Sequence, residues 1–207
     1  MKILILGATG PTGQQLVIQA LEKGHFVTAI VRDPLNLPVS HERLELRQID
    51  IFDQNLLSQE IADQDAVLSA LGTGRDLHSD FISRVMPVLI GAMNKANTRR
   101  LLFISSVGVG DTKKLASFFS KMVFRFFLKS ILDDKFKADQ LLRASNLDYT
   151  LIYPTSLTNG KKTGKYQAGT NIKLPFYPRI SRAHVADFML KEMVENKFIR
   201  QTAIITD

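Results

Sequence analysis

Three regularly spaced glycines near the start of the chain lie where they could bind phosphate. The segment GATGPTG spans residues 7–13, directly after a short apolar run and at the start of a helical pattern. Glycines there let the backbone approach a pyrophosphate closely, and the helix N-terminus contributes free N–H groups. The G-x-x-G-x-x-G spacing departs from the G-x-G-x-x-G fingerprint and would also suit a simple strand–helix turn. Its place in the first strand–helix–strand unit favours a dinucleotide site.

The end of the second apolar run indicates which dinucleotide would bind. Sites for NAD usually carry a carboxylate there, about 20 residues after the glycines, for the ribose hydroxyls. In this chain Arg32 lies nineteen residues after Gly13 and is followed by Asp33. A guanidinium can bind a 2′-phosphate through two parallel hydrogen bonds and can stack on adenine. Asp33 could bind the ribose instead, and Arg32 could be an ordinary surface charge, but the pattern favours NADP over NAD.

Polar and small residues also follow the third, fourth and fifth apolar runs. The carboxyl ends of parallel strands face a common ligand crevice. Asp50 and Ile51 follow the third run, and Asp50 could accept a hydrogen bond from the adenine amino group. The backbone of residues 72–74 could lie along the cofactor, and Ser105 and Ser106 come where a nicotinamide would lie. The alternative role for Asp50 and Ser106 is helix capping.

Five segments of the chain match one protein family, in the family's order and with few gaps. They are GATGPTG at 7–13, VRD at 31–33, QDAVLSALGTGRDL at 64–77, DD at 133–134 and ISRAHVADFML at 180–190. On these motifs the chain resembles the atypical short-chain dehydrogenases of the NmrA-like group, and within it the biliverdin-IXβ reductase/flavin reductase branch. The resemblance covers essentially the whole chain. It implies an NADPH-dependent reductase that transfers a hydride directly to a planar acceptor stacked on the nicotinamide.

The same resemblance implies which residues form the site. Cofactor contacts are expected from Gly7, Thr9, Gly10, Pro11, Thr12, Gly13, Arg32, Asp50, Ile51, Leu71, Gly72, Thr73, Arg75, Ser105, Pro154 and Thr155. Ser106 and Lys135 are expected either to polarise the acceptor or only to hold the cofactor. The acceptor could be a flavin, a linear tetrapyrrole, a quinone or a dye, with flavin bound as a substrate and not as a prosthetic group.

One departure from ordinary short-chain dehydrogenases bears on the reaction. Those enzymes use Tyr-x-x-x-Lys, in which the lysine lowers the pKa of the tyrosine so that it exchanges a proton with an alcohol or ketone. Lys135 stands at the lysine position here, but Ile131 stands four residues earlier. Alcohol oxidation is therefore not expected. The flavin reductase branch also lacks the tyrosine and has a histidine where this chain has Lys135, so the preferred acceptor could differ.

Net charge and composition bound the other functions. The chain has 207 residues, 27 Lys and Arg against 20 Asp and Glu, and no cysteine. A charge of +7 favours anionic partners, but phosphate-binding pockets explain it without nucleic acid, for which no binding motif is present. The histidines show no ligand spacing, so no metal site is expected. The rival function is that of a non-catalytic NmrA-like redox sensor that binds NADP.

These residues need a particular set of elements to position them. Continuous apolar runs predict strands at 3–6, 26–31, 44–49, 66–71, 101–104, 149–153 and 203–205, and helical patterns cover 12–23, 55–61, 81–96, 115–132, 135–145 and 183–196. Their alternation predicts an α/β fold, a doubly wound parallel sheet of the NAD(P)-binding Rossmann type, in one domain over 1–207. Residues 158–182 are predicted to form a long loop or hairpin on the substrate side.

The predicted helix at 115–132 is unusual because it is rich in phenylalanine. Lys121, Arg125 and Lys129 recur at four-residue spacing and would form one basic stripe. The pattern suits a core helix with a solvated edge, and the alternatives are a lid over the acceptor or a membrane-surface or partner contact. Glycines and polar residues interrupt the uncharged stretch at 3–21, so it is not expected to be a signal or transmembrane segment. A cytoplasmic, monomeric protein is expected.

Overall fold

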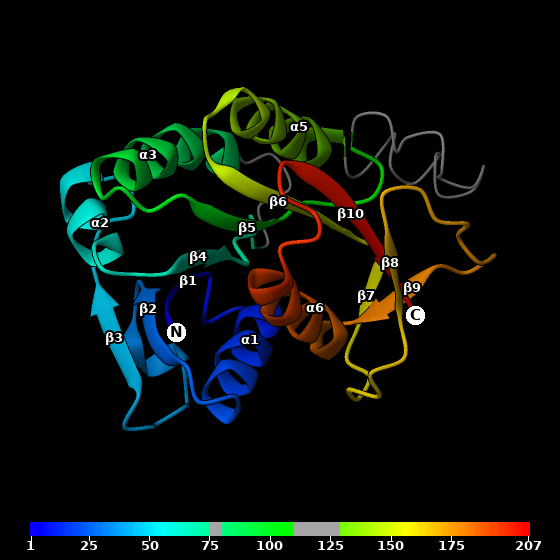
Figure 1. Ribbon diagram of the computed structural model, residues 1–207, viewed down its shortest axis with the longest axis horizontal. Helices are drawn as coiled ribbons and strands as arrows, with labels where there is room; N and C mark the ends of the chain where they lie inside the picture. Colours follow the sequence, from blue (N-terminus) through cyan, green and yellow to red (C-terminus); the bar gives the residue numbers. More distant parts are fainter. Residues whose placement is uncertain (75–79, 110–128) are drawn as a thin grey trace.

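A sheet of eight strands runs through the computed structural model, which describes residues 1–74, 80–109 and 129–207 (Figure 1). The strand order is β3-β2-β1-β4-β5-β6-β10-β8, and only the edge strand β8 pairs antiparallel with its neighbour among these strands. The strands are β1 (Lys2–Leu6), β2 (Phe26–Val31), β3 (Leu44–Gln48), β4 (Ala66–Ser69), β5 (Arg100–Ile104), β6 (Asp148–Pro154), β7 (Ser156–Thr158), β8 (Gln167–Gly169), β9 (Arg179–Ser181) and β10 (Gln201–Thr206).

Helices cover both faces of this sheet, as Figure 1 shows. They are α1 (Pro11–Glu22), α2 (Gln54–Ile61), α3 (Phe81–Lys95), α5 (Lys129–Ala144) and α6 (Arg182–Glu195), with a 3₁₀ turn at Pro34–Asn36. One core cluster joins α1 and α6 to the sheet, and a second joins α2, α3 and α5 to it. The central strands β1 and β4–β6 are buried almost throughout because helices pack on both sides of them. The predicted α/β Rossmann fold is confirmed.

The strand order reverses between β1 and β4, and this reversal creates the ligand crevice. From β1 the chain winds outward to β2 and β3, and it then crosses to the other side of β1 and continues through β4, β5 and β6. Loops that leave the carboxyl ends of β1 and β4 therefore diverge, and ligands of open α/β sheets bind where they part. The predicted site residues follow these strands, so the topology brings them to one edge of the sheet.

Two elements differ from the sequence-based prediction. The helix α5 runs without a break from Lys129 to Ala144, whereas separate helices were predicted at 115–132 and 135–145; residues 115–128 of the first lie outside the described part of the chain. Residues 158–182 are not a simple hairpin, because β7 and β9 pair in parallel while β8 joins β10 in the main sheet. No described helix has the length and apolarity needed to span a membrane.

Candidate active site

A long cleft follows the carboxyl ends of the parallel strands, with a volume of about 2010 Å³. Pockets for a single small ligand usually have about 300–1,000 Å³, so this cleft can hold a dinucleotide and a second molecule. Sixteen of the predicted site residues line it: Gly7, Thr9, Gly10, Pro11, Thr12, Arg32, Asp50, Ile51, Leu71, Gly72, Thr73, Ser105, Ser106, Lys135, Pro154 and Thr155. Of the other two, Gly13 lies behind the cleft wall and Arg75 lies outside the described residues.

The glycine turn between β1 and α1 forms the middle of the cleft floor. Gly7 has a φ of +76°, and a Cβ on it would lie 2.6 Å from the carbonyl oxygen of Ala70, so only glycine fits there. Gly10 is the N-cap of α1 and has no side chain to satisfy the first-turn N–H groups, which therefore stay available to an anion. Pro11 at the first helical position pre-sets the helix geometry without a missing hydrogen bond.

Gly13, a predicted phosphate contact, is absent from the cleft lining and has a packing role. It is buried in the first turn of α1, where a Cβ would lie 2.0 Å from the carbonyl oxygen of Gly7. This glycine allows α1 to pack closely on the turn. It supports the phosphate site through packing and does not itself face the cleft.

The expected adenine end of the cleft is formed by residues that follow β2 and β3. Arg32 is exposed, and its guanidinium has no hydrogen bond or ion pair with the residues that the structure describes, while Gln48 Nε2 donates to its backbone carbonyl at 2.8 Å. Asp33 is also exposed, and its two carboxylate oxygens each accept one local hydrogen bond, from Leu35 N and Asn36 Nδ2 at 3.0 and 2.9 Å. Asp50 accepts from the Phe52 N–H, also at 3.0 Å.

Of the two suggested helix-capping roles, that of Asp50 is wrong. The N-cap of α2 is Asp53, whose carboxylate accepts from Asn55 N and Leu56 N. The hydroxyl of Ser106 donates to the carbonyl of Val107 at 3.1 Å and caps no helix in the described part of the chain. Both residues stay available to a ligand at the cleft surface.

At the other end of the cleft, behind the strand ends of β5 and β6, four polar side chains form a connected cluster. Lys135 Nζ donates to the backbone carbonyl of Ser105 at 2.9 Å. The Ser105 hydroxyl and the Tyr153 phenol both donate to Asp139 Oδ2, at 2.8 and 2.6 Å. The second carboxylate oxygen of Asp139 is buried and has no hydrogen-bond partner among the described residues. The cluster fixes Lys135 and the end of β5 relative to each other.

Burial shifts the pKa values of Lys135, Asp139 and Tyr153 in the direction that favours the neutral form of each side chain. It lowers the pKa of Lys135 to about 8, although the carboxylates of Asp139 and Asp134 act in the opposite direction. It raises the pKa of Asp139 to about 6, against the hydrogen bonds from Tyr153 and Ser105. Burial and the neighbouring Asp139 raise the pKa of Tyr153. Lys135 is thus the cation of the cluster that reaches the cleft at neutral pH.

Comparison with known proteins identifies the family. A family model described as NAD(P)H-binding matches residues 7–196. The chain belongs to this NAD(P)H-binding family. An uncharacterised protein of Bacillus subtilis, YwnB, is 28% identical over 177 residues, which are 82% of this chain and 79% of YwnB.

Two solved structures share the fold of this NAD(P)H-binding chain. ChuY of Escherichia coli O157:H7, described as an anaerobilin reductase, superposes with a TM-score of 0.81 at 21% identity over 99% of this chain and 96% of ChuY. SP1627 of Streptococcus pneumoniae, a candidate NADH-flavin reductase, superposes with a TM-score of 0.82 at 24% identity over 100% of this chain and 99% of SP1627.

The residues of the cleft fit an NAD(P)H molecule from end to end. The bare N-terminus of α1 at Gly10 would hold the pyrophosphate, and the backbone at Gly72, where a Cβ would meet no atom within 4 Å, leaves room beside it. Ile51 and Arg32 would lie at the adenosine end, and Lys135 at the nicotinamide end. Bound NAD(P)H supplies a hydride. No group of three His, Asp or Glu in residues 1–74, 80–109 and 129–207 is placed to hold a metal ion.

The sequence analysis missed the carboxylates that organise this end of the fold. Asp134 accepts hydrogen bonds from Ile82 N and Ser83 N, at 3.0 and 2.8 Å, and so caps α3 from a neighbouring helix. Asp139 binds Ser105 and Tyr153 across three elements. One signal was available, since an acidic residue at 139 lies four positions after Lys135 on the same helix face.

Asp139→Asn is expected to remove a pH dependence of stability. The pKa of Asp139 is higher in the folded state, about 6, than in an unfolded chain, about 3.9. Ionisation of Asp139 therefore destabilises the folded state. The stabilisation by the protonated carboxyl group is fully present below pH 4 and is lost as the pH rises through 6. Two pKa units correspond to about 3 kcal/mol at most. Urea denaturation at pH 4.5 and 7.5 should show wild type losing more stability than Asp139→Asn over this interval.

Asp133→Asn, one residue before Asp134 on α5, is the control for this experiment and should follow wild type. In Asp139→Asn the amide oxygen of the new side chain can accept both hydrogen bonds that Asp139 Oδ2 accepts, so the pH slope separates charge from lost contacts. Parallel slopes for wild type and Asp139→Asn would show that this carboxylate does not titrate in the interval.

Proposed function

We propose that the protein is an NADPH-dependent reductase that passes a hydride from the nicotinamide to a planar acceptor, with flavin the first candidate. The observation that carries this proposal is the wall of the cleft beyond the nicotinamide end. Leu157, Phe176 and Tyr177 line it, and their exposed fractions are 39, 82 and 81%. Large apolar side chains that stand so far into solvent at a ligand cleft suit a flat aromatic partner. The names of the structural neighbours ChuY and SP1627 support the same acceptor class.

The side chains near the nicotinamide end support hydride transfer without an obligatory acid. On α5 Ile131 lies one turn before Lys135, and both line the cleft, so no phenol stands where alcohol dehydrogenation would need one. The nearby phenol of Tyr153 points away into the buried carboxylate of Asp139. A flavin reduced by hydride takes its proton from solvent, and the open cleft admits water.

The direct test is steady-state oxidation of NADPH with added FMN, riboflavin or a quinone dye, followed by the loss of NADPH absorbance. Turnover with one planar acceptor and no turnover with simple ketones is the expected result. Tight NADPH binding without oxidation by any acceptor would contradict the proposal and favour a redox sensor.

Ser106→Ala and Lys135→Ala are each expected to slow the single-turnover oxidation of NADPH by FMN by about 10- to 100-fold, the lower range of general acid–base effects. The reason is that positioning the two rings within about 3–3.5 Å supplies much of the rate, and the proton comes from solvent. Both variants are measured at saturating NADPH and FMN, with the NADPH affinity determined separately. A loss beyond a thousandfold at normal NADPH affinity would reveal an obligatory proton donor.

A further inference from the structure

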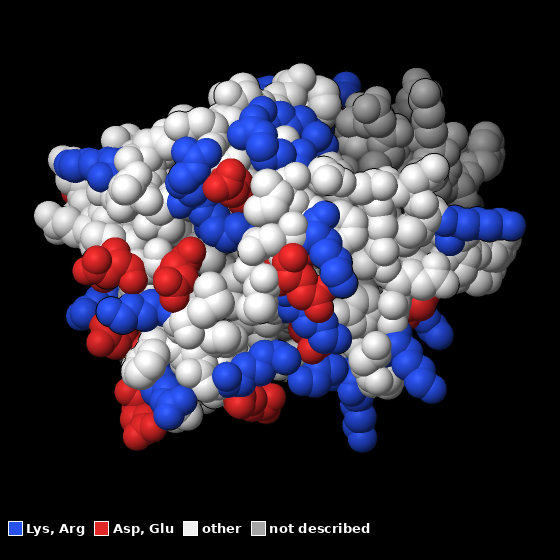
Figure 2. All heavy atoms as spheres, viewed as in Figure 1, with Lys and Arg blue, Asp and Glu red and all other residues white. Residues whose placement is uncertain are grey.

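The positive charge of the chain is concentrated beside the acceptor end of the cleft. Between Asp148 and Asp187 the sequence has no acidic residue but has six cations, whereas the whole chain has a net charge of +7. The cations are Lys161, Lys162, Lys165, Lys173, Arg179 and Arg182. We call residues 160–182 the basic segment. In Figure 2 Lys and Arg side chains project from the right-hand and lower right parts of the molecule, where Figure 1 shows β7, β8 and β9, with little acidic surface among them.

Within the described part of the chain, these six cations have no carboxylate partner. None of them forms an ion pair with a residue that the structure describes, whereas Arg47 and Arg100 elsewhere pair with carboxylates of Glu45, Glu60 and Glu192. The guanidinium of Arg182 donates to a neutral amide oxygen, Asn159 Oδ1, at 2.7 Å. The basic segment therefore gives this end of the cleft a positive field that no paired carboxylate among the described residues offsets.

Two of the cations reach the cleft wall itself. In the parallel pair of β7 and β9, Arg179 lies opposite Ser156, two residues after Pro154 at the nicotinamide end. Arg182 begins α6 directly after β9, and both arginines line the cleft. They line the same cleft as Phe176 and Tyr177, whose rings meet edge to face with centroids 4.7 Å apart. The cleft wall thus offers both apolar surface for a ring and cations for a negative group.

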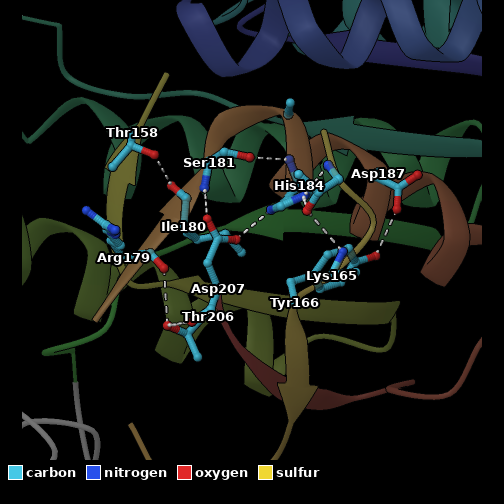
Figure 3. A network of polar contacts seen from close by, with 12 residues as sticks. Thr158, Lys165, Tyr166, Arg179, Ile180, Ser181, His184, Asp187, Thr206 and Asp207 are labelled. Atoms are coloured by element: carbon cyan, nitrogen blue, oxygen red, sulfur yellow. Dashed lines mark hydrogen bonds and ion pairs between the residues drawn. The ribbon is translucent and has the colours of Figure 1, made fainter. Parts of the chain in front are cut away.

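A polar network around the buried His184 holds the basic segment in place (Figure 3). His184 Nε2 accepts hydrogen bonds from Thr163 N and Gly164 N at 2.9 and 3.2 Å, and Nδ1 contacts Asp207 Oδ1 at 2.5 Å. The other oxygen of Asp207 accepts from Ser181 N at 3.1 Å. In Figure 3 the side chain of Arg179 points away from this network. The carboxylate of Asp207 therefore contacts His184 and Ser181, and it forms no ion pair with Arg179 or Arg182 among the described residues.

We propose that Arg179 and Arg182 bind an anionic substituent, a phosphate or carboxylate, of the planar acceptor. This inference rests on the proposed reductase function and adds the chemical class of its substrate. The phosphates of the cofactor do not account for these arginines, because the pyrophosphate belongs at the glycine turn after β1 and the 2′-phosphate at Arg32 after β2. Both positions are on the other side of the nicotinamide end from β7 and β9.

FMN and riboflavin test the proposal, because they share the isoalloxazine ring and differ by one phosphate. Binding of each flavin to the NADP⁺-loaded protein is measured by quenching of flavin fluorescence. Wild type should bind FMN about 10- to 100-fold more tightly than riboflavin, as expected for charge-assisted hydrogen bonds. Arg179→Gln and Arg182→Gln should each lose about tenfold or more for FMN and leave riboflavin unchanged. Lys162→Gln, in the same segment but not on the cleft wall, should change neither more than about twofold at physiological salt, which screens distant charges.

A carboxylate is distinguished from a phosphate by comparing a linear tetrapyrrole with its dimethyl ester in the same assay. The proposal is supported if wild type prefers the anionic member of either ligand pair, FMN over riboflavin or the tetrapyrrole over its ester, and the arginine variants lose this preference. Equal affinity within both pairs, no binding of any of the four ligands, or a preference that survives both arginine substitutions overturns it. Anion-dependent binding without NADPH oxidation would support the anion site and contradict the reductase function. NADPH-dependent reduction of FMN and riboflavin with equal kcat/KM would support the reductase function and contradict the anion site.

Discussion

Gly10→Val is expected to abolish NADPH binding, with a loss of about a thousandfold or more, while the protein stays folded. A Cβ at Gly10 would meet only the Gly7 carbonyl oxygen, at 3.4 Å, and the backbone there is extended, with φ −74° and ψ 158°. Valine adopts that conformation without strain. Its methyl groups would occupy the space at the helix N-terminus that a pyrophosphate needs. Calorimetric titration with NADPH measures the loss of binding, and thermal denaturation measures folding.

Gly13→Ala is the matched comparison, because it should mainly lower the stability of the fold, whereas Gly10→Val should mainly abolish NADPH binding. Its Cβ would lie 2.0 Å from the Gly7 carbonyl oxygen, with backbone on both sides, so α1 must shift away from the turn. We expect a large drop in the melting temperature for Gly13→Ala. For Gly10→Val we expect only a few degrees, since valine is a poorer N-cap than glycine by about 1 kcal/mol. Tight NADPH binding by Gly10→Val would show that the glycine turn is only structural.

The features that the sequence predicted correctly are those set by local pattern. The strands at the centre of the sheet are uninterrupted apolar runs, which only a sheet covered on both faces can bury. Their alternation with helices, and the right-handed crossovers that follow, leave few possible topologies. Residues that directly follow parallel strands lie at the same edge of the sheet, and this is why most of the sixteen predicted site residues meet in one cleft.

The features that could not be predicted depend on contacts between distant segments. Nothing near Asp139 in the sequence indicates that Ser105 and Tyr153 will donate to it from β5 and β6. The parallel pairing of β7 with β9 likewise needs a return of the chain through β8, which three-residue strands do not signal. For Gly13 the phosphate contact stays a prediction, and the structure adds a packing role, which the glycine fingerprint does not distinguish from contact with phosphate.

Arg32 carries the proposed choice of NADPH over NADH, and the local contacts of Asp33 favour this choice. Asp33 was the candidate ribose ligand of an NAD site, and each of its carboxylate oxygens already accepts one hydrogen bond within the turn at residues 33–36. Arg32 lines the cleft with no polar partner for its guanidinium among the described residues. A dianionic 2′-phosphate beside it would gain a charge-assisted, two-point contact, which NADH cannot make.

Arg32→Ala should therefore weaken NADPH binding by about 10- to 150-fold, equivalent to about 1.5–3 kcal/mol, and leave NADH binding nearly unchanged. Asp33→Asn is the neighbouring control: its carboxylate is engaged locally, so the ratio of NADPH to NADH affinity should stay close to that of wild type. Dissociation constants for both cofactors are measured by titration of the three proteins at one salt concentration, because exposed charge contacts weaken as salt rises. Equal losses for NADPH and NADH in Arg32→Ala would refute the 2′-phosphate assignment. A selective loss of NADH binding in Asp33→Asn would move the ribose contact to that carboxylate and make NAD the better cofactor.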